Sequence, residues 1–129
     1  DSLGLFAARE IVRAIGRGFN PEIASLLLKQ DYVYEQISIT DYAKTKKHMM
    51  RLKGRVIGSG GKTRELIEEL TGCYLSVYGK TIAIIGTQEN VAVSRKSVEM
   101  LLTGSQHATV YRWLEKQRRE TKRKNLVEW

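Results

Sequence analysis

Apolar residues near the start of the chain recur every three or four positions, a spacing that predicts an amphipathic helix over residues 3–15. The apolar face of this helix carries Leu5, Ala8, Ile11, Val12 and Ile15. Ser2 is the expected N-cap, and Gly16 and Gly18 are the expected stop signals. The pattern therefore predicts that the chain opens with one helix and a turn.

A second, shorter helix is expected over residues 21–29, because Asn20 can cap it and Pro21 suits the first helical position. From Tyr32 to Tyr42 the apolar spacing changes to alternation, which is typical of a strand. One face of that strand would carry Val33, Glu35, Ile37 and Ile39, and the other face Tyr34, Gln36, Ser38 and Thr40.

Helical spacing returns over residues 45–57, which place three apolar side chains on one face, at Met49, Leu52 and Val56. A glycine-rich loop follows at residues 58–61. Residues 62–70 then predict another amphipathic helix, with Gly72 as its C-cap. Two helices joined by a short loop are therefore expected in the middle of the chain.

Two alternating segments, residues 73–78 and 81–85, are joined by a turn at residues 79–80 and predict a β-hairpin. Thr87 is expected to cap the next helix, and Ser105 to cap a last helix that runs into a basic tail. From the first predicted strand onward the order of elements is β-α-α-β-β-α. This order predicts an α+β fold, with a three-stranded antiparallel sheet packed on helices and extra helices at both ends.

Composition narrows the class of protein. The 129 residues are 42% apolar and include one Pro, which predicts a folded domain and not a disordered chain. No run approaches the roughly 18 apolar residues of a membrane helix. The chain begins at Asp1, so we expect a fragment or a processed form, with no signal peptide visible. A single Cys73 with only two His offers no disulfide and no zinc site, which indicates a reducing compartment and no metal.

Positive charge gathers around the glycine-rich loop. The net charge is +8, and residues 44–64 contain eight Lys and Arg residues and no acid. Cations around flexible backbone suit a polyphosphate partner such as nucleic acid. A second basic block at residues 112–124 carries a net charge of +5. For that second block a solvated helix face is an equally good interpretation.

The segment VIGSGGKT, residues 56–63, ends in Gly-Lys-Thr as a Walker A nucleotide-binding loop does. The spacing fails, because a Walker A loop needs Gly where this sequence has Val56. A basic helical stretch precedes the loop in place of a buried strand, and the apolar run at residues 82–86 lacks an acid to hold magnesium. A dinucleotide fingerprint starting at Gly58 fails at Thr63. An NTP-binding domain is kept only as an alternative.

A third interpretation is the G-x-x-G loop that joins two helices in KH domains, here at residues 58–61. The motif alone is common by chance, so its specificity comes from the flanking sequence. Gly54 and Ile57 precede the loop, Lys62 follows it, and the next helix ends at residues 71–72 before an alternating strand. These features match the KH pattern G-x-[IV]-I-G-x-x-G-[K/R]…[ST]-G-x-x-[IL]-x-[IV].

This arrangement has a direct use in RNA binding. Glycines let an RNA backbone approach closely, and free N–H groups at the start of the helix near Lys62 would face phosphate. Ile57 on one side and Leu75 and Val77 on the other would line a narrow groove for about four unpaired bases, whose edges Ser76 and the strand backbone can reach. The candidate RNA-binding residues are Gly54, Arg55, Ile57, Gly58, Ser59, Gly60, Gly61, Lys62, Arg64, Leu75, Ser76, Val77 and Lys80.

Most of the chain resembles a particular family, the archaeal and eukaryotic KH proteins of small-ribosomal-subunit assembly, which are Dim-two-like and also described as partner-of-Nob RNA-binding proteins. The resemblance rests on AAREIVRAIGRGF, RLKGRVIGSGGKTRELIEELTG, SVYGKTIAIIG and VEMLLTGSQHATVYRWLEKQRR, which together span most of residues 7–119. The sequence departs from many KH domains at Ser59, where Lys or Arg is common, and at Arg64, which is often aliphatic.

The resemblance implies a type I KH fold and a division of the chain into three parts. Residues 1–30 would be the C-terminal helices of a truncated first KH-like module, residues 31–104 the KH domain with the G-x-x-G loop, and residues 105–129 a C-terminal helix and basic tail. It implies binding of single-stranded RNA near the 3′ end of small-subunit ribosomal RNA. Implied partners are the Nob endonuclease and, in archaea, the alpha subunit of translation initiation factor two, with a cytoplasmic location and also a nuclear or nucleolar one in a eukaryote.

No nucleophile with a neighbouring base, no carboxylate pair and no cofactor site emerges from the sequence, so we expect a chain that is not an enzyme. A KH-like module that docks protein without productive RNA contacts is the alternative among binding functions. Cys73 is expected in the core, and Tyr111, Trp113 and Leu114 are expected to pack the last helix onto the domain.

Overall fold

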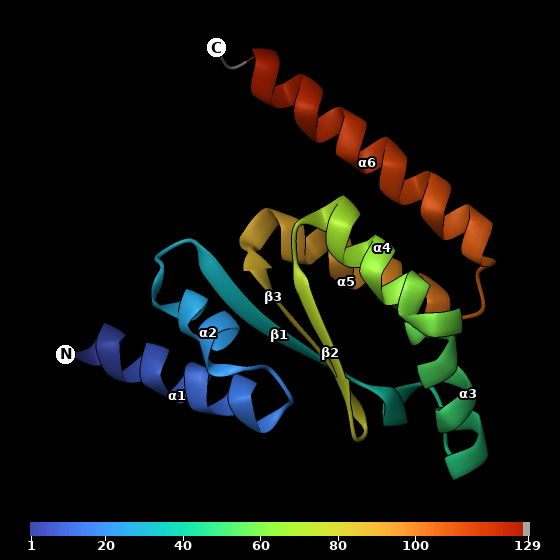
Figure 1. Cartoon of the computed structure of the whole chain (residues 1–129), viewed down its shortest axis with the longest axis horizontal. Helices are drawn as coiled ribbons and strands as arrows, with labels where there is room; N and C mark the ends of the chain where they lie inside the picture. The colour runs from blue at the N-terminus through green and yellow to red at the C-terminus, as the bar shows by residue number, and fades with distance from the viewer. Residues whose placement is uncertain (128–129) are drawn as a thin grey trace.

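The structure, a computed structural model, describes residues 1–127 and arranges them around a small sheet (Figure 1). One face of the sheet is covered by α1 (Ser2–Gly16), α2 (Pro21–Ala24) and the 3-10 helix η1 (Ser25–Leu28). The other face is covered by α3 (Lys46–Ile57), α4 (Lys62–Thr71) and α5 (Gln88–Leu102). A last helix, α6 (His107–Val127), packs on α4 and α5.

The sheet is antiparallel and contains β1 (Tyr32–Ser38), β2 (Tyr74–Tyr78) and β3 (Thr81–Thr87) in the order β1-β3-β2. The hairpin of β2 and β3 and the order β-α-α-β-β-α are as the sequence pattern predicted, and the α+β fold class is confirmed. Because β3 is central, β2 is an edge strand whose outer side pairs with no other strand of the sheet.

The central strand β3 is buried on both of its faces. Ile82 and Ile84 pack in a core shared with α3, α4, α5 and α6, whereas Ala83 and Ile85 pack in a second core shared with α1 and α2. Side chains alternate between the two faces of a strand, so a strand covered on both sides reads as a continuous apolar run. The N-terminal helices are therefore part of the folded core.

The start and end of the first helix differ in detail from the sequence prediction. Asp1, and not Ser2, is the N-cap, and its Oδ1 accepts a hydrogen bond from the backbone N–H of Gly4 at 2.6 Å. At the other end Gly18 has φ of +98°, and the N–H of Phe19 donates to the carbonyl of Ala14 at 3.2 Å. This is a Schellman C-cap, which turns the chain sharply toward the sheet.

Two predicted elements are shorter than expected. The helix predicted over residues 21–29 has only four α-helical residues, capped by Asn20 as predicted, and then continues as the 3-10 helix η1. The hydroxyl of Ser25 donates to the carbonyl of Glu22 at 2.7 Å, a local bond that competes with α-helical continuation. The first strand ends at Ser38, because the backbone turns at Ile39 into the 3-10 helix η2 (Ile39–Asp41).

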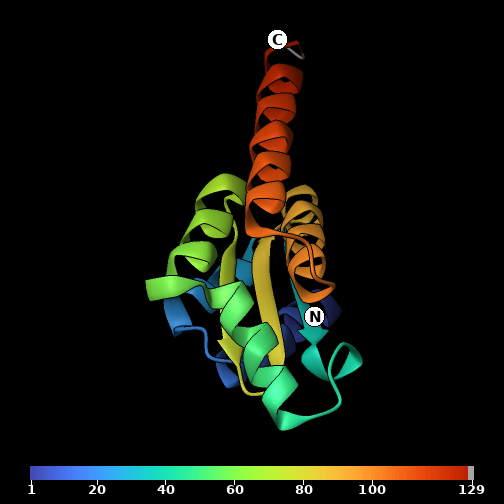
Figure 2. The same ribbon diagram turned by 90° about the vertical axis from the view of Figure 1, so that its right-hand side faces the viewer.

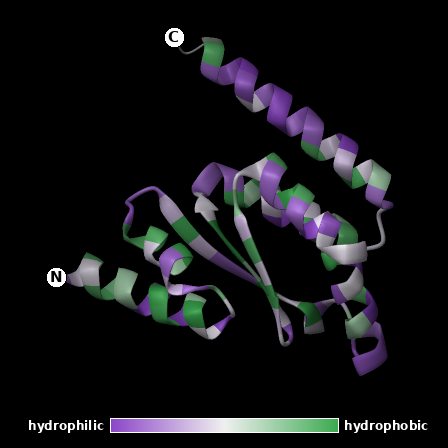
Figure 3. Ribbon diagram, viewed as in Figure 1, coloured by the Kyte–Doolittle hydropathy of each residue, from purple (hydrophilic) through white to green (hydrophobic). Residues whose placement is uncertain are grey.

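The buried residues of α6 lie in the first half of the helix. Val110 and Leu114 are fully buried, and Trp113 packs against the same core, as predicted. From residue 118 to residue 126 every side chain is exposed. Arg118, Thr121 and Lys122 still line a hollow with the end of α4 and the start of α5, and the mostly hydrophilic end of the helix extends beyond the rest of the molecule (Figures 2 and 3). Helix α6 begins at His107, and the N–H of Val110 donates to the carbonyl of Gln106 at 3.1 Å, so Gln106, and not the predicted Ser105, occupies the N-cap position.

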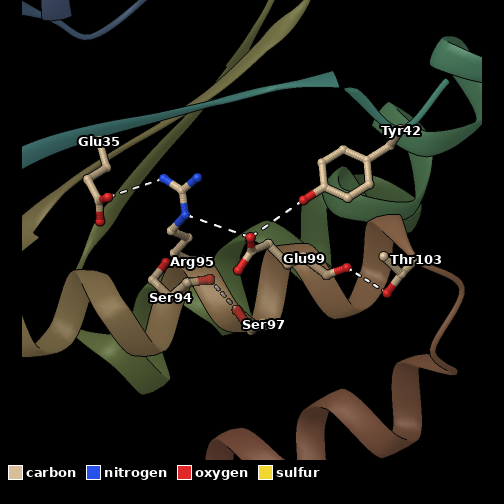
Figure 4. A network of polar contacts seen from close by, with 7 residues as sticks. All are labelled: Glu35, Tyr42, Ser94, Arg95, Ser97, Glu99 and Thr103. Atoms are coloured by element: carbon tan, nitrogen blue, oxygen red, sulfur yellow. Dashed lines mark hydrogen bonds and ion pairs between the residues drawn. The ribbon is translucent and has the colours of Figure 1, made fainter. Parts of the chain in front are cut away.

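A polar network ties β1 to α5 on the side of the molecule away from β2 (Figure 4). Arg95 Nη1 lies 3.2 Å from Glu35 Oε1, and Arg95 Nε lies 3.8 Å from Glu99 Oε2. The hydroxyl of Tyr42 donates to Glu99 at 3.5 Å. Burial, together with the nearby Glu99 carboxylate, raises the pKa of Tyr42, so its hydroxyl keeps its proton and remains a donor.

Among residues 1–127, none of the helices combines the length and the apolar content that crossing a lipid bilayer requires.

Candidate nucleic-acid interface

A groove of about 400 Å³ lies between the edge strand β2 and the helices α3 and α4. Five of the predicted site residues line it, namely Ile57, Arg64, Leu75, Ser76 and Val77. The structure thus brings together the end of α3, the first turn of α4 and the outer side of β2, although these segments are separated along the chain.

Glu68 organises the polar side of this groove. Its Oε2 accepts the backbone N–H of Leu75 at 2.8 Å, and its Oε1 lies 3.3 Å from Arg64 Nη1. The Arg64 side chain is 39% exposed and keeps N–H groups that face solvent. Glu68 therefore orients the Arg64 guanidinium, which places a positive charge in the groove. The sequence analysis missed Glu68, whose position one helical turn after Arg64 was the available signal.

Ser76 is already engaged by the N-terminal segment. Its hydroxyl donates to the backbone carbonyl of Arg17 at 2.7 Å. The hydroxyl proton is thus used within the protein, and the oxygen remains available only as an acceptor. Ser76, which was predicted to contact base edges, can therefore only accept a hydrogen bond from a base and cannot donate one.

Four residues of the N-terminal segment also line the groove, and the sequence analysis did not select them: Gly18, Phe19, Asn20 and Ile23. Tyr74 at the start of β2 contributes as well. No local pattern in the sequence signals the contribution of residues 18–23, because it arises from packing of α1 and α2 on one face of the sheet.

The G-x-x-G loop leaves α3 and enters α4 through a tight turn, with the N–H of Gly58 donating to the carbonyl of Gly54 at 2.8 Å. Gly58 has φ of +76°, and a Cβ there would lie 2.7 Å from the backbone nitrogen of Thr63. A Cβ at Gly60 or Gly61 would meet nothing within 4 Å. The inner glycine is therefore required for close packing, while the outer loop surface is open to a ligand.

A second hollow, of about 470 Å³, lies on the other side of the loop. The predicted site residues that line it are Gly54, Arg55, Gly58, Ser59 and Lys62. Arg51 and Thr63, which were not among the predicted site residues, line it as well. Helix α6 closes it with His107 and Tyr111. The Tyr111 hydroxyl is hydrogen-bonded to Thr63 Oγ1 at 2.8 Å, which fixes α6 to the first turn of α4.

Arg55 has a structural role in addition to its charge. Its Nε donates to the carbonyl of Leu101 at 2.9 Å, and its Nη2 donates to the carbonyl of Ser105. These bonds satisfy one carbonyl in the last turn of α5 and one in the loop between α5 and α6. The Arg55 guanidinium is therefore held beside the loop and is not free to follow a ligand.

The loop is surrounded by cations that are not neutralised locally. Within the described part of the chain, no carboxylate forms an ion pair with Arg51, Arg55 or Lys62, and α4 has no side-chain N-cap. A helix N-terminus with free N–H groups and cations on both sides attracts anions. Lys80 lies apart, on the exposed turn between β2 and β3, and lines neither hollow.

Two other features limit the chemistry of this surface. No group of three or more His, Cys, Asp or Glu side chains that could hold a metal ion is found in residues 1–127. The GSGGKT segment joins two helices, whereas a Walker A loop joins a strand to a helix. The arrangement provides positive charge, backbone N–H groups and an apolar floor, which together suit binding of a flexible polyanion.

The groove and its loop have the form of a known domain. A sequence model described as eukaryotic type KH-domain, KH-domain type I, matches residues 33–119. The chain belongs to the type I KH-domain family. Within that family, the matched model is that of the second KH domain of PNO1, which confirms the resemblance noted in the sequence. KH domains are binding domains and not a class of enzymes, in agreement with expectation.

Several relatives of this KH chain are named proteins. A KH domain-containing protein of Methanocaldococcus jannaschii is 53% identical over 129 residues, which are 100% of this chain and 57% of the relative. RNA-binding protein PNO1 of Oryzias latipes is 31% identical over 113 residues, 86% of this chain and 46% of the relative. Pre-rRNA-processing protein PNO1 of Chaetomium thermophilum is 33% identical over 105 residues, which are 79% of this chain and 40% of the relative. The chain spans about half the length of the curated relatives it matches.

Solved structures agree with the KH fold. A protein of unknown function from Aeropyrum pernix superposes with a TM-score of 0.94 and 39% identity, over 99% of this chain and 68% of that one. The complex of a/eIF2alpha, aDim2p and rRNA from Pyrococcus horikoshii superposes with a TM-score of 0.87 and 44% identity, over 93% of this chain and 66% of that one.

Proposed function

We propose that this KH domain binds single-stranded RNA, with the sugar–phosphate backbone on the G-x-x-G loop and the bases in the groove beside β2. The observation that carries the proposal is the position of the loop. Its open outer surface, the start of α4 with no side-chain cap, and Lys62, which has no ion pair within the described residues, lie beside a groove with an apolar floor along the edge strand β2. Phosphates and bases of one strand need these two surfaces side by side.

The thirteen predicted residues have different parts in this proposal. Ile57, Leu75 and Val77 supply the apolar floor. Within the groove Arg64 supplies a cation, and the Ser76 oxygen supplies a hydrogen-bond acceptor. The loop residues 58–61 and Lys62 meet phosphate. Gly54 and Arg55 support the loop from the end of α3, and Lys80 contacts only RNA that extends past the hairpin turn.

The names of relatives support a more particular target. The Chaetomium relative is named a pre-rRNA-processing protein, and the aDim2p neighbour was solved with rRNA and the alpha subunit of an initiation factor. We therefore infer that the RNA is small-subunit ribosomal RNA, in its 3′ region, and that the chain acts in processing of its precursor. The same inference includes the Nob endonuclease and the initiation factor subunit as partners, and the cytoplasm, with the nucleus in a eukaryote, as location.

The proposed division of the chain has one structural support. Helix α1 carries large apolar side chains that are exposed, including Leu3 at 82%, Val12 at 70% and Phe6 at 63%. Exposed apolar residues on one helix mark a surface that packs against further protein. We propose that residues 1–30 are the end of a first KH-like module whose other residues cover this surface.

A pair of acidic substitutions in the loop tests the proposed function. Ser59→Asp with Gly60→Asp would place two carboxylates where phosphate binds, and we expect at least about a tenfold loss of RNA affinity, or 1.4 kcal/mol, with the fold retained. The control is Gln30→Asp with Ala92→Asp, which adds the same charge at two exposed positions outside the groove.

Fluorescence anisotropy with a labelled single-stranded oligonucleotide from the 3′ end of small-subunit rRNA measures both double variants, and circular dichroism checks their folding. Equal RNA affinity of the loop variant and the wild type would refute the groove as the binding site. An isothermal titration of the wild type with Mg-ATP tests the alternative of an NTP-binding domain. Stoichiometric binding with a micromolar dissociation constant, abolished by Lys62→Ala, would favour NTP binding over RNA binding.

A further inference from the structure

One wall of the groove comes from residues that lie outside the KH match. The family model begins at residue 33, whereas the groove is also lined by Gly18, Phe19, Asn20 and Ile23. Gly18, Phe19 and Asn20 lie in the turn between α1 and α2, and Ile23 lies in α2 itself. The turn lies against β2, where the carbonyl of Arg17 accepts a hydrogen bond from Ser76. The groove is thus lined both by the matched KH domain and by a segment that precedes the match.

The turn is held firmly against the strand. Phe19 is 6% exposed and packs in the second core with Ala83 and Ile85. The carbonyl of Arg17 accepts the Ser76 hydroxyl at 2.7 Å. Backbone and strand approach so closely that a Cβ at Gly18 would lie 2.6 Å from Ser76 Oγ. A wall with buried anchors and a short hydrogen bond keeps its position relative to the groove, which a contact with a specific ligand requires.

Asn20 is the polar side chain that this wall presents. Its Oδ1 accepts the backbone N–H of Ile23 at 2.8 Å and caps α2. Its Nδ2 makes no hydrogen bond within the described residues, and the side chain is exposed. An amide whose oxygen is fixed by a cap has an oriented NH₂ group with two donors to offer. Because the Ser76 proton is already used, Asn20 supplies a free side-chain donor from this wall of the groove.

We propose that the turn between α1 and α2, together with Ile23 of α2, is an additional RNA-contacting wall, in which the Asn20 amide donates to an acceptor atom on one base while Ile23 contacts the base face. The proposal rests on the proposed function, since it needs single-stranded RNA in the groove. A carbonyl oxygen or ring nitrogen of an unpaired base is the acceptor that such an amide recognises. The N-terminal segment thereby contributes to the selection of the nucleotide bound beside β2.

Two substitutions separate this role from helix capping. Asn20→Ser keeps a good N-cap and removes the amide, and Asn20→Asp keeps the cap while replacing the donor with an acceptor. We expect about a three- to tenfold loss of RNA affinity in N20S and a larger loss in N20D, with unchanged thermal unfolding. Gln30→Asp controls for the charge added by N20D, because Gln30 is exposed and lies outside the groove.

An abasic scan identifies the contacted nucleotide. Oligonucleotides from the 3′ end of small-subunit rRNA, each lacking one base, are measured against wild type and N20S. At one position the penalty for removing the base should be smaller in N20S than in wild type by the same three- to tenfold factor, as expected for two groups that contact each other. A penalty that is the same in both proteins at every position overturns the base contact.

The outcomes distinguish the wall from the groove itself. If N20S and N20D bind RNA like wild type while the loop variant S59D/G60D loses binding, Asn20 does not contact RNA. The proposal that RNA binds in the groove beside the G-x-x-G loop is then still supported. If wild type does not bind the oligonucleotides, both the proposed function and this inference fail. If N20S unfolds at a lower temperature and N20D does not, the comparison of N20D with Q30D alone decides, and equal affinities of those two overturn the inference.

Discussion

Glu68 and Leu75 join α4 to the edge strand β2, with Glu68 Oε2 accepting the backbone N–H of Leu75 at 2.8 Å. An N–H on the free edge of a sheet otherwise pairs with water or with another strand. The same carboxylate holds Arg64 at 3.3 Å, so its negative charge is balanced where RNA would enter. The Glu68 side chain thus holds α4 against β2 across the groove. Its ion pair with Arg64 prevents an uncompensated negative charge there, which would repel RNA.

This relationship predicts unequal effects of two substitutions at Glu68. Glu68→Ala removes the acceptor of the Leu75 N–H, and we expect a loss of about 1 kcal/mol in the free energy of unfolding. Glu68→Gln keeps an amide oxygen that can accept the same bond, so its loss should be less than half as large. Urea denaturation followed by circular dichroism measures both. Equal losses would mean that the ion pair with Arg64, and not the bond to β2, is the stabilising contact.

The two ends of the G-x-x-G loop should respond differently to a methyl group. Gly58→Ala adds a Cβ that would lie 2.7 Å from the nitrogen of Thr63, at φ of +76°, so it should lower both the free energy of unfolding, by about 2 kcal/mol, and RNA affinity. Gly61→Ala is the matched control, since Gly61 has a similar φ of +79° but open space around it. The same loss of stability in both variants would assign the effect to backbone strain alone.

The exposed part of α6 predicts a measurable change in salt dependence. For single strands, log affinity falls with log salt by about 0.7 per neutralised phosphate. We expect removal of residues 118–129 to lower RNA affinity and to flatten this slope by about one to two units, with base preference unchanged. Mobile Lys and Arg side chains contact the backbone and do not read base edges.

A salt series with matched and scrambled RNA tests this prediction. The triple variant Lys122→Gln, Arg123→Gln and Lys124→Gln keeps the length of the helix and should reproduce most of the flattening. Loss of the matched-over-scrambled ratio on truncation would show that the tail reads sequence. No change in either quantity would identify residues 118–129 as a solvated helix face.

Cys73 should be protected from alkylation in the native state. Burial raises the pKa of its thiol from the ordinary 9.0 to about 11, and the side chain is 2% exposed. At pH 8 the raised pKa alone reduces the reactive thiolate about 100-fold. Iodoacetamide should therefore label the native protein at least about 100-fold more slowly than the urea-unfolded protein. Similar labelling rates in the two states would contradict the buried position.

The same raised pKa predicts a direction for stability at alkaline pH. The native state binds the thiol proton more tightly than the unfolded state, so this contribution is fully present below pH 9.0 and is lost as pH rises through about 11. Comparing wild type with Cys73→Ala in urea denaturation at pH 8 and pH 10.5 isolates it. The wild type should lose more stability than the variant across this interval.

Local features of the chain were predictable because they depend on neighbours in the sequence. The helix over residues 62–71 ends at Gly72, which has φ of +72° as a left-handed C-cap requires, and Asn20 with Pro21 begins α2. The hairpin follows from alternation on both sides of a two-residue turn. The G-x-x-G loop and its flanking residues were equally visible, because the pattern lies within one continuous stretch.

Contacts between distant segments were decided only by packing. Arg55 was predicted to contact RNA, yet its guanidinium binds the carbonyls of Leu101 and Ser105, which no spacing near residue 55 reveals. The Ser76 hydroxyl is likewise used by Arg17, 59 residues earlier. The sequence around each of these residues is explained by its own helix, strand or turn and does not indicate the distant partner. Which residues pair depends on the way in which whole helices cover the sheet.

The sequence by itself determined the order of elements, the loop and the apolar side of the groove, because hydrophobic period and glycine positions encode them locally. Tertiary structure alone decided that β3 is covered on both faces and that residues 18–23 form a wall beside β2. Burial of Phe19 against Ala83 and Ile85 places that wall. Burial of this kind is a property of two surfaces that meet in space, and neither segment shows it separately.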